Sequence, residues 1–499
     1  MLQIKNKNYL NNVFFCVALF SAPILAIAPI GIWIPLILGA LILLPISQGL
    51  ITSLKKNVLF KILIIAFFWI FLSILLIVKN LNFLEKFLHF FVLIMAGTIL
   101  CKDILKTTKL DKIIIVFAIS FLLSSFFIII DLKFSLGLKL WLSKNLDFAN
   151  FEKFYQLKSW IDFTDFRNQE SNLIISYLRS SYDRGATGLI ILAFPLCLIC
   201  YKYKYKILAF IVLITSIALA YLNLNLTIFL NLFVSVPIAL FYYHKRNIFK
   251  KYFFWILATY SILSPFILGQ LEYKNYSYYE NSLLEKSFSY SKKYCDSNFY
   301  KEIYMYYDNF NIYLKCGVYK NPDYSSLEYN ENFNLEKKLD KILIFLTYKM
   351  YQITSQKIHR LIIWSYAKEK IMEKPFLGHG FYSSRDMSQE IKQTERGTNY
   401  QFIPLHPHNS ILQIWLELGI FGIIIFLLFI KILLNKIYNL KTINSLVPTI
   451  IVFSFLQIFV TSQIAYGFWQ SWWIAIIIIN FILYSFLFSS IRTNETQLN

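Results

Sequence analysis

Residues 58–78 read VLFKILIIAFFWIFLSILLIV, an apolar run in which Lys61 is the only charged residue. About 20 consecutive apolar residues form a helix long enough to cross the hydrocarbon core of a bilayer. Similar runs recur along the chain, for example at 113–130 and 419–434. Because a backbone in lipid must satisfy its own hydrogen bonds, and because the runs do not alternate in polarity, we predict membrane-spanning helices and not a barrel.

The composition of the 499-residue chain supports this class, since 57% of its residues are hydrophobic and soluble proteins average about 45–50%. The formal net charge of +21 would suit a nucleic-acid partner. The charges, however, lie in short connections between apolar runs, where they would meet membrane lipids. We therefore expect no nucleic acid among the partners.

We predict an all-α polytopic membrane protein with about twelve transmembrane helices. The expected spans lie at approximately 11–29, 32–47, 58–78, 84–100, 113–131, 185–201, 206–222, 225–243, 252–269, 411–434, 445–463 and 472–489. The apolar run after the basic N-terminus continues beyond Pro29, so we interpret it as the start of the bundle and not as a signal peptide.

The distribution of cations predicts the orientation. With the N-terminus in the cytoplasm, about twenty Lys and Arg residues fall on the cytoplasmic side, while the short outside connections hold Lys79 and Lys86. Residues 1–269 are then nine helices with an outside loop at about 132–184. Residues 270–410 form a large outside loop, and residues 411–499 form three more helices that return the C-terminus to the cytoplasm.

The large loop contains two cysteines, Cys295 and Cys316, whereas the other four lie in or beside spans. Two cysteines in an oxidising compartment can form a disulfide. Two unrelated free thiols are the alternative, and the sequence leaves both open.

Four of the six histidines also lie in this loop or at its end: His359, His379, His406 and His408. Histidine is the natural general base near neutral pH, although ordinary loop histidines would show the same pattern. A helix is expected to start near Asn409, because Asn409 or Ser410 can cap it. His408 would then lie at the helix entrance, at the outer membrane surface.

Three further charged residues are candidates for function. Glu417 is an acid within an apolar stretch, where it either serves function or pairs with a neighbouring helix. Arg360 begins an expected amphipathic helix, and Arg184 stands where an outside loop enters a span. A guanidinium group suits phosphate oxygens, but solvated or membrane-anchoring arginines are the common alternative.

Motifs for other chemistries are missing from the sequence. It has no P-loop lysine pattern and no GxGxxG opening a soluble domain. Zinc bound by His406, His408 and a third ligand is weakly supported, so we expect no metal and no cofactor.

The stretch from His408 resembles the signature of bacterial O-antigen ligases: His, then Asn, Ser or Gln, nine residues, Gly, two residues, then Gly, Thr or Tyr. The matching positions are His408, Asn409, Gly419 and Gly422. Residues 360–364 and 375–380 resemble the Arg-Leu-x-x-Trp and Pro-x-x-Gly-x-Gly runs of the wider ligase and polymerase family. Residues 184–187 resemble the arginine of that family at the mouth of a mid-chain span. The insert at about 271–340 is longer and more polar than the family pattern.

The resemblance implies a GT-C-like glycosyltransferase that is metal-independent and inverting. Its donor would be a glycan on undecaprenyl diphosphate, and its acceptor a sugar hydroxyl of the lipid A–core. The active site would lie at the periplasmic face of the bacterial inner membrane. An O-antigen polymerase or a protein O-glycan ligase would use the same donor, and a membrane transporter is a more distant alternative.

The resemblance also implies roles for particular residues. His408 would take the proton from the acceptor hydroxyl, and Arg184 and Arg360 would neutralise the diphosphate. The expected substrate-binding residues are Asn409, His406, Trp364, Gly378, Gly380 and Glu417.

Overall fold

The computed structural model describes residues 2–47, 57–78, 82–133, 170–223, 226–269, 302–308, 311–319, 327–334, 360–361, 363–387, 391–393, 399–401, 403, 405–440 and 446–498. Most of the predicted outside loop at 132–184 and most of 270–359 therefore lie outside the described residues, as does Cys295.

Ten helices in the described part of the chain are long and apolar enough to cross a membrane. They are α1 (Leu2–Ile27), α4 (Val58–Ser73) with its π-helical continuation (Ile74–Val78), α5 (Asn82–Asp103), α6 (Leu110–Lys133), α9 (Glu170–Lys202), α10 (Lys206–Asn223), α11 (Leu226–His244), α12 (Arg246–Leu268), α15 (Ser410–Tyr438) and α16 (Leu446–Ile464). Two shorter apolar segments, α2 (Trp33–Leu43) and the first part of α17 (Ser471–Leu498), stand at the second and last predicted spans. The predicted polytopic helical membrane protein is therefore confirmed.

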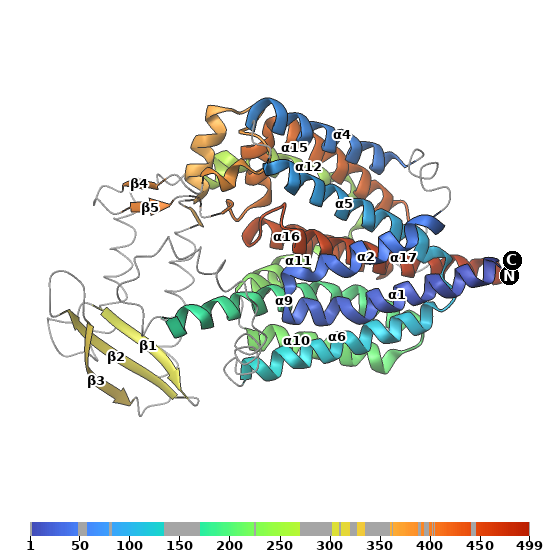
Figure 1. The fold of residues 1–499 in the computed structure, drawn as a ribbon, viewed down its shortest axis with the longest axis horizontal. Helices are drawn as coiled ribbons and strands as arrows, with labels where there is room; N and C mark the ends of the chain where they lie inside the picture. The colour runs from blue at the N-terminus through green and yellow to red at the C-terminus, as the bar shows by residue number, and fades with distance from the viewer. Residues whose placement is uncertain are drawn as a thin grey trace.

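The helices run side by side, and both chain termini lie at the same end of the bundle (Figure 1). Helix α9 packs against α1, α6, α10, α16 and α17. Of the most apolar window of α9, 78% is buried inside the protein, compared with 28% for α4. A helix that is apolar all round and largely exposed is typical of contact with lipid, so α9 belongs to the core and α4 to the periphery.

A close approach to α1 fixes α9 near the start of its apolar span, Ser181–Lys202. A Cβ atom on Gly185 would lie 2.6 Å from the Leu25 carbonyl oxygen of α1. Small residues let transmembrane helices approach closely enough for their backbones to touch. The contact holds α9 against α1 one residue after Arg184, and so sets where that arginine stands.

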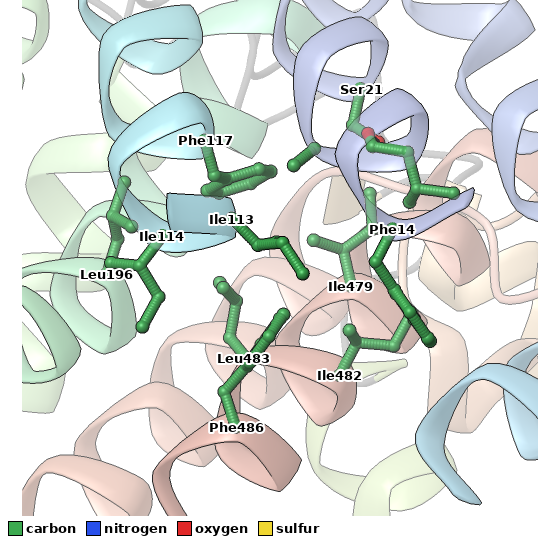
Figure 2. Close-up of a pocket in the computed structure, with 12 residues that line it drawn as sticks. Phe14, Ser21, Ile113, Ile114, Phe117, Leu196, Ile479, Ile482, Leu483 and Phe486 are labelled. Carbon is green, nitrogen blue, oxygen red and sulfur yellow. The ribbon is translucent and has the colours of Figure 1, made fainter. Parts of the chain in front are cut away.

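A small apolar gap lies between α1, α6, α9 and α17 (Figure 2). Ser21 is the single polar residue of its lining, and the Ser21 hydroxyl donates to the Val17 carbonyl oxygen at 2.6 Å. The other lining residues include Phe14, Phe117 and Leu483. Such a gap has no group to hold a polar substrate, so it is a packing feature of the bundle.

Two small antiparallel sheets lie within the predicted outside loop. β1 (Glu302–Asp308), β2 (Asn311–Tyr319) and β3 (Leu327–Asn334) pair in chain order, with an irregularity between Cys316 and Gly317. β4 (Ile391–Gln393) pairs with β5 (Asn399–Gln401). These strands were not predicted from the sequence, although β1 and β2 are rich in Tyr and Ile, which favour strands.

Helix α15 is interrupted at Gly419, where φ is 64° and ψ is −162°. Residues with a side chain rarely adopt a positive φ, so glycine suits this position. An interruption removes the helical donors of nearby carbonyl groups. Within a bilayer those carbonyls need replacement donors from the protein.

The segment 375–380 supplies two of these donors. The His379 backbone N–H donates to the Leu416 carbonyl oxygen at 2.8 Å. The Gly380 N–H donates to the Glu417 carbonyl oxygen, also at 2.8 Å. The amphipathic helix predicted to begin at Arg360 is present, because residues 363–373 are helical, and a turn follows near Pro375. That turn is what binds the broken helix.

Two further contacts complete the junction. The Trp69 indole N–H of α4 donates to the Leu418 carbonyl oxygen at 3.2 Å. In the opposite direction, the Ile420 N–H donates to the Pro375 carbonyl oxygen at 2.9 Å. The interruption of α15 therefore joins three parts of the chain that are far apart in sequence.

Gly419→Ala should destabilise the protein by roughly 2 kcal/mol or more, since a left-handed backbone costs an L-residue about 1–2 kcal/mol. The added Cβ would also lie 2.2 Å from the Phe376 carbonyl oxygen. Thermal unfolding of the detergent-solubilised protein measures the effect. The matched control is Gly31→Ala, where the nearest atom to the added Cβ is Ile34 Cδ1 at 3.6 Å. Equal unfolding temperatures for the two variants would contradict the role of Gly419.

Candidate functional site

Four segments far apart in sequence meet at the end of the bundle opposite the termini (Figure 1). They are the part of α9 that follows Arg184, helical residues 363–373, residues 403–409 before α15, and residues 465–470 between α16 and α17. Arg184, Arg360, His406 and His408, predicted from the sequence, all lie on these segments or at their ends.

His408 is held in a defined ring orientation. Its φ of 53° is positive, and its backbone N–H donates to His406 Nδ1 at 3.1 Å. His408 Nδ1 lies 2.8 Å from the Ala465 carbonyl oxygen. Because a carbonyl oxygen only accepts, Nδ1 must carry the proton, and in the neutral ring the lone pair then lies on Nε2. That tautomer is the one a general base requires.

His406 lies beside His408, with ring centroids 4.3 Å apart, and is 7% exposed. Burial lowers the pKa of His406 well below its ordinary value. The positive charges of His408, Arg184 and Arg385 lower the pKa of His406 further. His406 is therefore neutral near pH 7 and adds no positive charge beside His408.

The α16–α17 connection encloses the His406 ring. The Gln470 side-chain nitrogen lies 2.9 Å from His406 Nε2, and the Trp472 indole N–H donates to Gln470 Oε1 at 3.0 Å. A Cβ atom on Gly467 would lie 2.9 Å from the His406 ring. Gln470 and Gly467 thus enclose the ring on two sides.

Asn409 caps α15, as the sequence predicted. Its side-chain oxygen accepts the Leu412 N–H at 3.0 Å. Its side-chain nitrogen donates to the Gln463 carbonyl oxygen at 3.1 Å and contacts the Tyr260 hydroxyl at 3.3 Å. Because both ends of the amide bind the protein, these contacts favour a positioning role for Asn409 over the predicted substrate contact.

Trp364, like Asn409, forms a hydrogen bond within the protein. Its indole N–H donates to the Pro407 carbonyl oxygen at 2.9 Å, which ties the helix at 363–373 to the residues before α15. Trp364 was predicted to bind substrate, and this hydrogen bond indicates that it also positions the neighbouring His408.

Arg184 and Arg360 approach the site from different segments and act on the same residue. Burial lowers the pKa of Arg360. Both cations lie close enough to Tyr466 to influence its pKa, which burial raises to about 12. Among the described residues, neither arginine forms a hydrogen bond or an ion pair with a carboxylate. The positive charge of two partly buried guanidinium groups would attract an anionic ligand here.

Glu417 is fully buried and accepts four hydrogen bonds. Oε1 accepts from Ser384 Oγ at 2.6 Å and from Gln413 Nε2 at 2.9 Å. Oε2 accepts from the Tyr382 N–H at 2.7 Å and the Trp469 indole N–H at 2.6 Å. All the lone-pair positions of the carboxylate are occupied, so the geometry favours a positioning role over the substrate contact that we predicted.

Gly378 and Gly380 were also predicted to bind substrate, and both adopt a positive φ. A Cβ atom on Gly378 would lie 2.5 Å from the Glu417 carbonyl oxygen, and one on Gly380 would lie 2.1 Å from Val78 Cγ2. Close backbone packing explains both glycines without a substrate.

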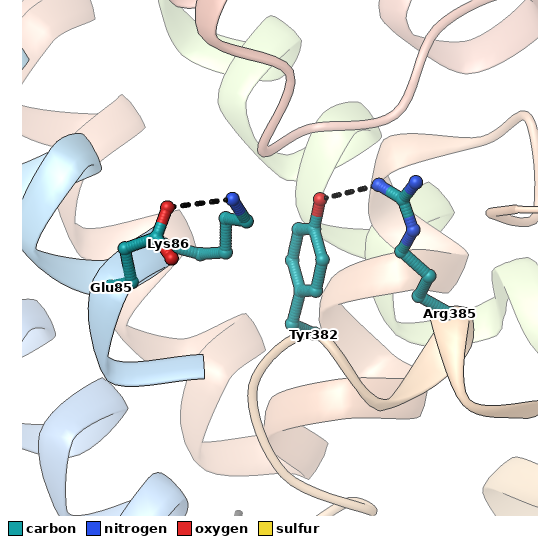
Figure 3. A network of polar contacts seen from close by, with 4 residues as sticks. All are labelled: Glu85, Lys86, Tyr382 and Arg385. Carbon is teal, nitrogen blue, oxygen red and sulfur yellow. Dashed lines mark hydrogen bonds and ion pairs between the residues drawn. The ribbon is translucent and has the colours of Figure 1, made fainter. Parts of the chain in front are cut away.

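The sequence reasoning missed Tyr382 and Arg385. The Arg385 guanidinium donates to the Tyr382 hydroxyl at 3.0 Å and lies over its ring at 5.8 Å. Figure 3 shows the Tyr382 ring between the side chains of Lys86 and Arg385, and Lys86 pairs with Glu85 at 3.0 Å. In the sequence, Arg385 stands five positions after Gly380, and this spacing alone is a weak indication of function.

Other predictions fall outside what the structure describes. Cys295 and His359 lie outside the described residues, and the side chain of Cys316 is not described, so the predicted disulfide remains a prediction. Among the described residues, no group of three or more His, Cys, Asp or Glu side chains is arranged to hold a metal ion.

The fold and the site define a multi-pass membrane protein with histidines and arginines gathered at one end of its helices. A family model described as O-antigen ligase matches residues 173–427, slightly more than half of the chain. The match includes Arg184, Arg360, His408 and Gly419. The chain belongs to the O-antigen ligase family.

Curated proteins named "Putative polysaccharide ligase" are similar over a shorter stretch. The protein from Rickettsia conorii is 41% identical over 119 residues, which cover 23% of this chain and 28% of the relative. Those from Rickettsia felis (40% over 121 residues) and Rickettsia typhi (41% over 118 residues) each match over 23% of this chain and 29% of the relative. The chain thus spans less than a third of each relative. No solved structure matches it.

The burial of His406 leads us to predict that the folded protein loses stability in acid. The pKa of His406 in the folded protein lies below the ordinary value of 6.5, so the unfolded chain takes up the proton first. The stability that depends on neutral His406 is complete above about pH 6.5 and is lost as the pH falls toward the folded pKa. The loss is at most about 1.4 kcal/mol per pH unit.

His406→Gln should therefore reduce the loss of stability between about pH 6.5 and 5, measured as the thermal unfolding temperature in detergent. His244→Gln, at the exposed end of α11, is the matched control and should keep the wild-type pH dependence. If His406→Gln lost as much stability in acid as the wild type, His406 would not be the group responsible.

Proposed function

We propose that this protein is an O-antigen ligase that transfers a glycan from undecaprenyl diphosphate to a sugar hydroxyl of the lipid A–core. One observation carries the proposal: His408, with its proton fixed on Nδ1, shares a site with Arg184 and Arg360, which have no carboxylate partner among the described residues. A base and a positively charged site for the leaving anion are the two requirements of a displacement in which diphosphate leaves.

The reaction balances with the groups available. The acceptor oxygen forms a bond to the anomeric carbon while the bond from that carbon to the diphosphate oxygen breaks. The proton of the acceptor hydroxyl goes to His408 Nε2, and the electron pair leaves with the diphosphate. A single displacement of this kind inverts the anomeric configuration, and it needs no metal because arginines supply the positive charge.

The neighbours of His408 suit this role. Once His408 is protonated, its Nδ1–H still donates to the Ala465 carbonyl oxygen, so the charged ring keeps its place. His406 stays neutral, which avoids a second positive ring 4.3 Å away. Both features favour proton uptake by His408 during the transfer.

The location is part of the proposal. We propose that the protein lies in the bacterial inner membrane, with both termini in the cytoplasm and the site in the periplasm. The asymmetry of Lys and Arg between the connections supports this orientation, as does the common end of the two termini (Figure 1). In this arrangement residues 1–269 and 411–499 are membrane domains, and residues 270–410 are a periplasmic segment that carries Arg360, His406 and His408.

His408→Ala should lower the transfer rate by roughly 10²–10⁴-fold, the usual contribution of a general base. The assay reconstitutes the protein with a glycan on undecaprenyl diphosphate and offers lipid A–core, a second glycan–lipid or a protein as acceptor. His244→Ala is the control. Transfer to lipid A–core supports the ligase, whereas elongation of the lipid-linked glycan or transfer to protein would replace it with a polymerase or a protein ligase. Normal transfer by His408→Ala would exclude this base.

Arg360→Lys should lower kcat/KM for the donor by roughly 10- to 100-fold, because lysine keeps the charge but loses the paired donors that suit a phosphate. Arg246→Lys is the matched control, since the Arg246 guanidinium donates to the Tyr438 carbonyl oxygen at 2.9 Å, away from the site. Wild-type kinetics for Arg360→Lys would show that charge alone is enough at this position.

A further inference from the structure

The four hydrogen bonds to Glu417 connect the interior of α15 with two surface segments. Tyr382 and Ser384 belong to the segment that follows Gly380, and Trp469 belongs to the α16–α17 connection. The Tyr382 and Trp469 groups are N–H donors and cannot accept a hydrogen bond. The set therefore matches a carboxylate, which only accepts.

The contact with Tyr382 fixes an unusual backbone conformation. Tyr382 has a φ of 67°, a region that residues with side chains rarely adopt. Its N–H is bonded to Glu417, and its ring packs edge-on against Phe83 of α5 with centroids 5.4 Å apart. Backbone and ring are thus both held, and the hydroxyl has a fixed place.

Tyr382 in turn orients Arg385. The guanidinium donates to the Tyr382 hydroxyl (Figure 3), and its central carbon lies 5.8 Å from the centroid of the Tyr382 ring. Arg385 is exposed, so packing alone does not hold it. The buried Glu417 thus holds Tyr382, and Tyr382 in turn holds the exposed Arg385.

The segment of Tyr382 and Arg385 adjoins the site, because Trp469, which bonds the same Glu417 carboxylate as Tyr382, is followed by Gln470, whose side-chain nitrogen lies 2.9 Å from His406 Nε2. The charge of Arg385 acts on the buried His406, as the charge of Arg184 does from α9. Cations from two separate segments therefore lower the pKa of His406. An anion bound beside His408 would be attracted by both.

We propose that Arg385 is a third arginine that binds the diphosphate of the donor, and that Glu417 is the positioning residue that holds it there through Tyr382. This inference rests on the proposed function. It adds a substrate-binding residue that neither the sequence motifs nor the family resemblance indicated. It also explains why the acidic Glu417 lies within an apolar helix, since Glu417 positions Arg385 and does not contact the substrate.

Arg385→Ala should raise the donor KM by roughly 10- to 100-fold, the usual effect of losing a charged hydrogen bond, with a smaller change in kcat. Inorganic diphosphate, used as a competitive inhibitor, should bind this variant more weakly by a similar factor. Lys374→Ala removes an exposed cation that precedes Gly380 and is the control for net charge. An unchanged donor KM and unchanged inhibition by diphosphate would overturn the proposal.

Tyr382→Phe tests the positioning step, since it removes the hydroxyl and keeps the backbone bond to Glu417. It should raise the donor KM, but the double variant Tyr382→Phe/Arg385→Ala should be no worse than Arg385→Ala alone. Glu417→Gln should also raise the donor KM, and the double variant Glu417→Gln/Arg385→Ala should be no worse than Arg385→Ala alone. Effects that multiply in the double variant would mean that Tyr382 does not act through Arg385, and would overturn the positioning role.

The result separates this inference from the proposed function. A wild-type protein that transfers no glycan from any lipid-diphosphate donor would contradict the proposed function itself. An active wild type with unchanged kinetics in Arg385→Ala would contradict only the inference about Arg385 and Glu417.

Discussion

The interruption of α15 at Gly419 is the constraint on which the site depends. Carbonyl groups released from a helix in a bilayer must find donors within the protein. Here the backbone of His379 and Gly380 and the indole of Trp69 provide them. The need to satisfy this junction draws the segment after 363–373 and helix α4 against α15, and thereby places the functional segments together at one end of the bundle.

The same end of the bundle concentrates positive charge. Arg184, Arg360 and Arg385 come from three different segments, and each influences His406 or Tyr466. Holding like charges close together is unfavourable. That cost is removed when an anion binds, so the arrangement favours a ligand with several negative oxygens, such as a diphosphate.

Much of this organisation could be predicted from the sequence, because it is written in local patterns. Apolar runs of about 20 residues predicted the spans, and Asn409 before an apolar stretch predicted the start of α15, which the structure confirms. The spacing from His408 to Gly419 and Gly422 indicated the family, which the family match confirms. The strands β1–β3 were missed, because their Tyr-rich sequences were read only as a polar loop.

The sequence by itself therefore determined the class of fold, the family and the position of His408 at a helix entrance. Only the tertiary structure decided that the Glu417 side chain bonds Tyr382, Ser384 and Trp469, and that the Arg385 guanidinium bonds the Tyr382 hydroxyl. The physical reason is the range of the contacts. Capping and helix periodicity act within a few residues, whereas a hydrogen bond between residues 35 or 52 positions apart follows from how the broken helix is packed.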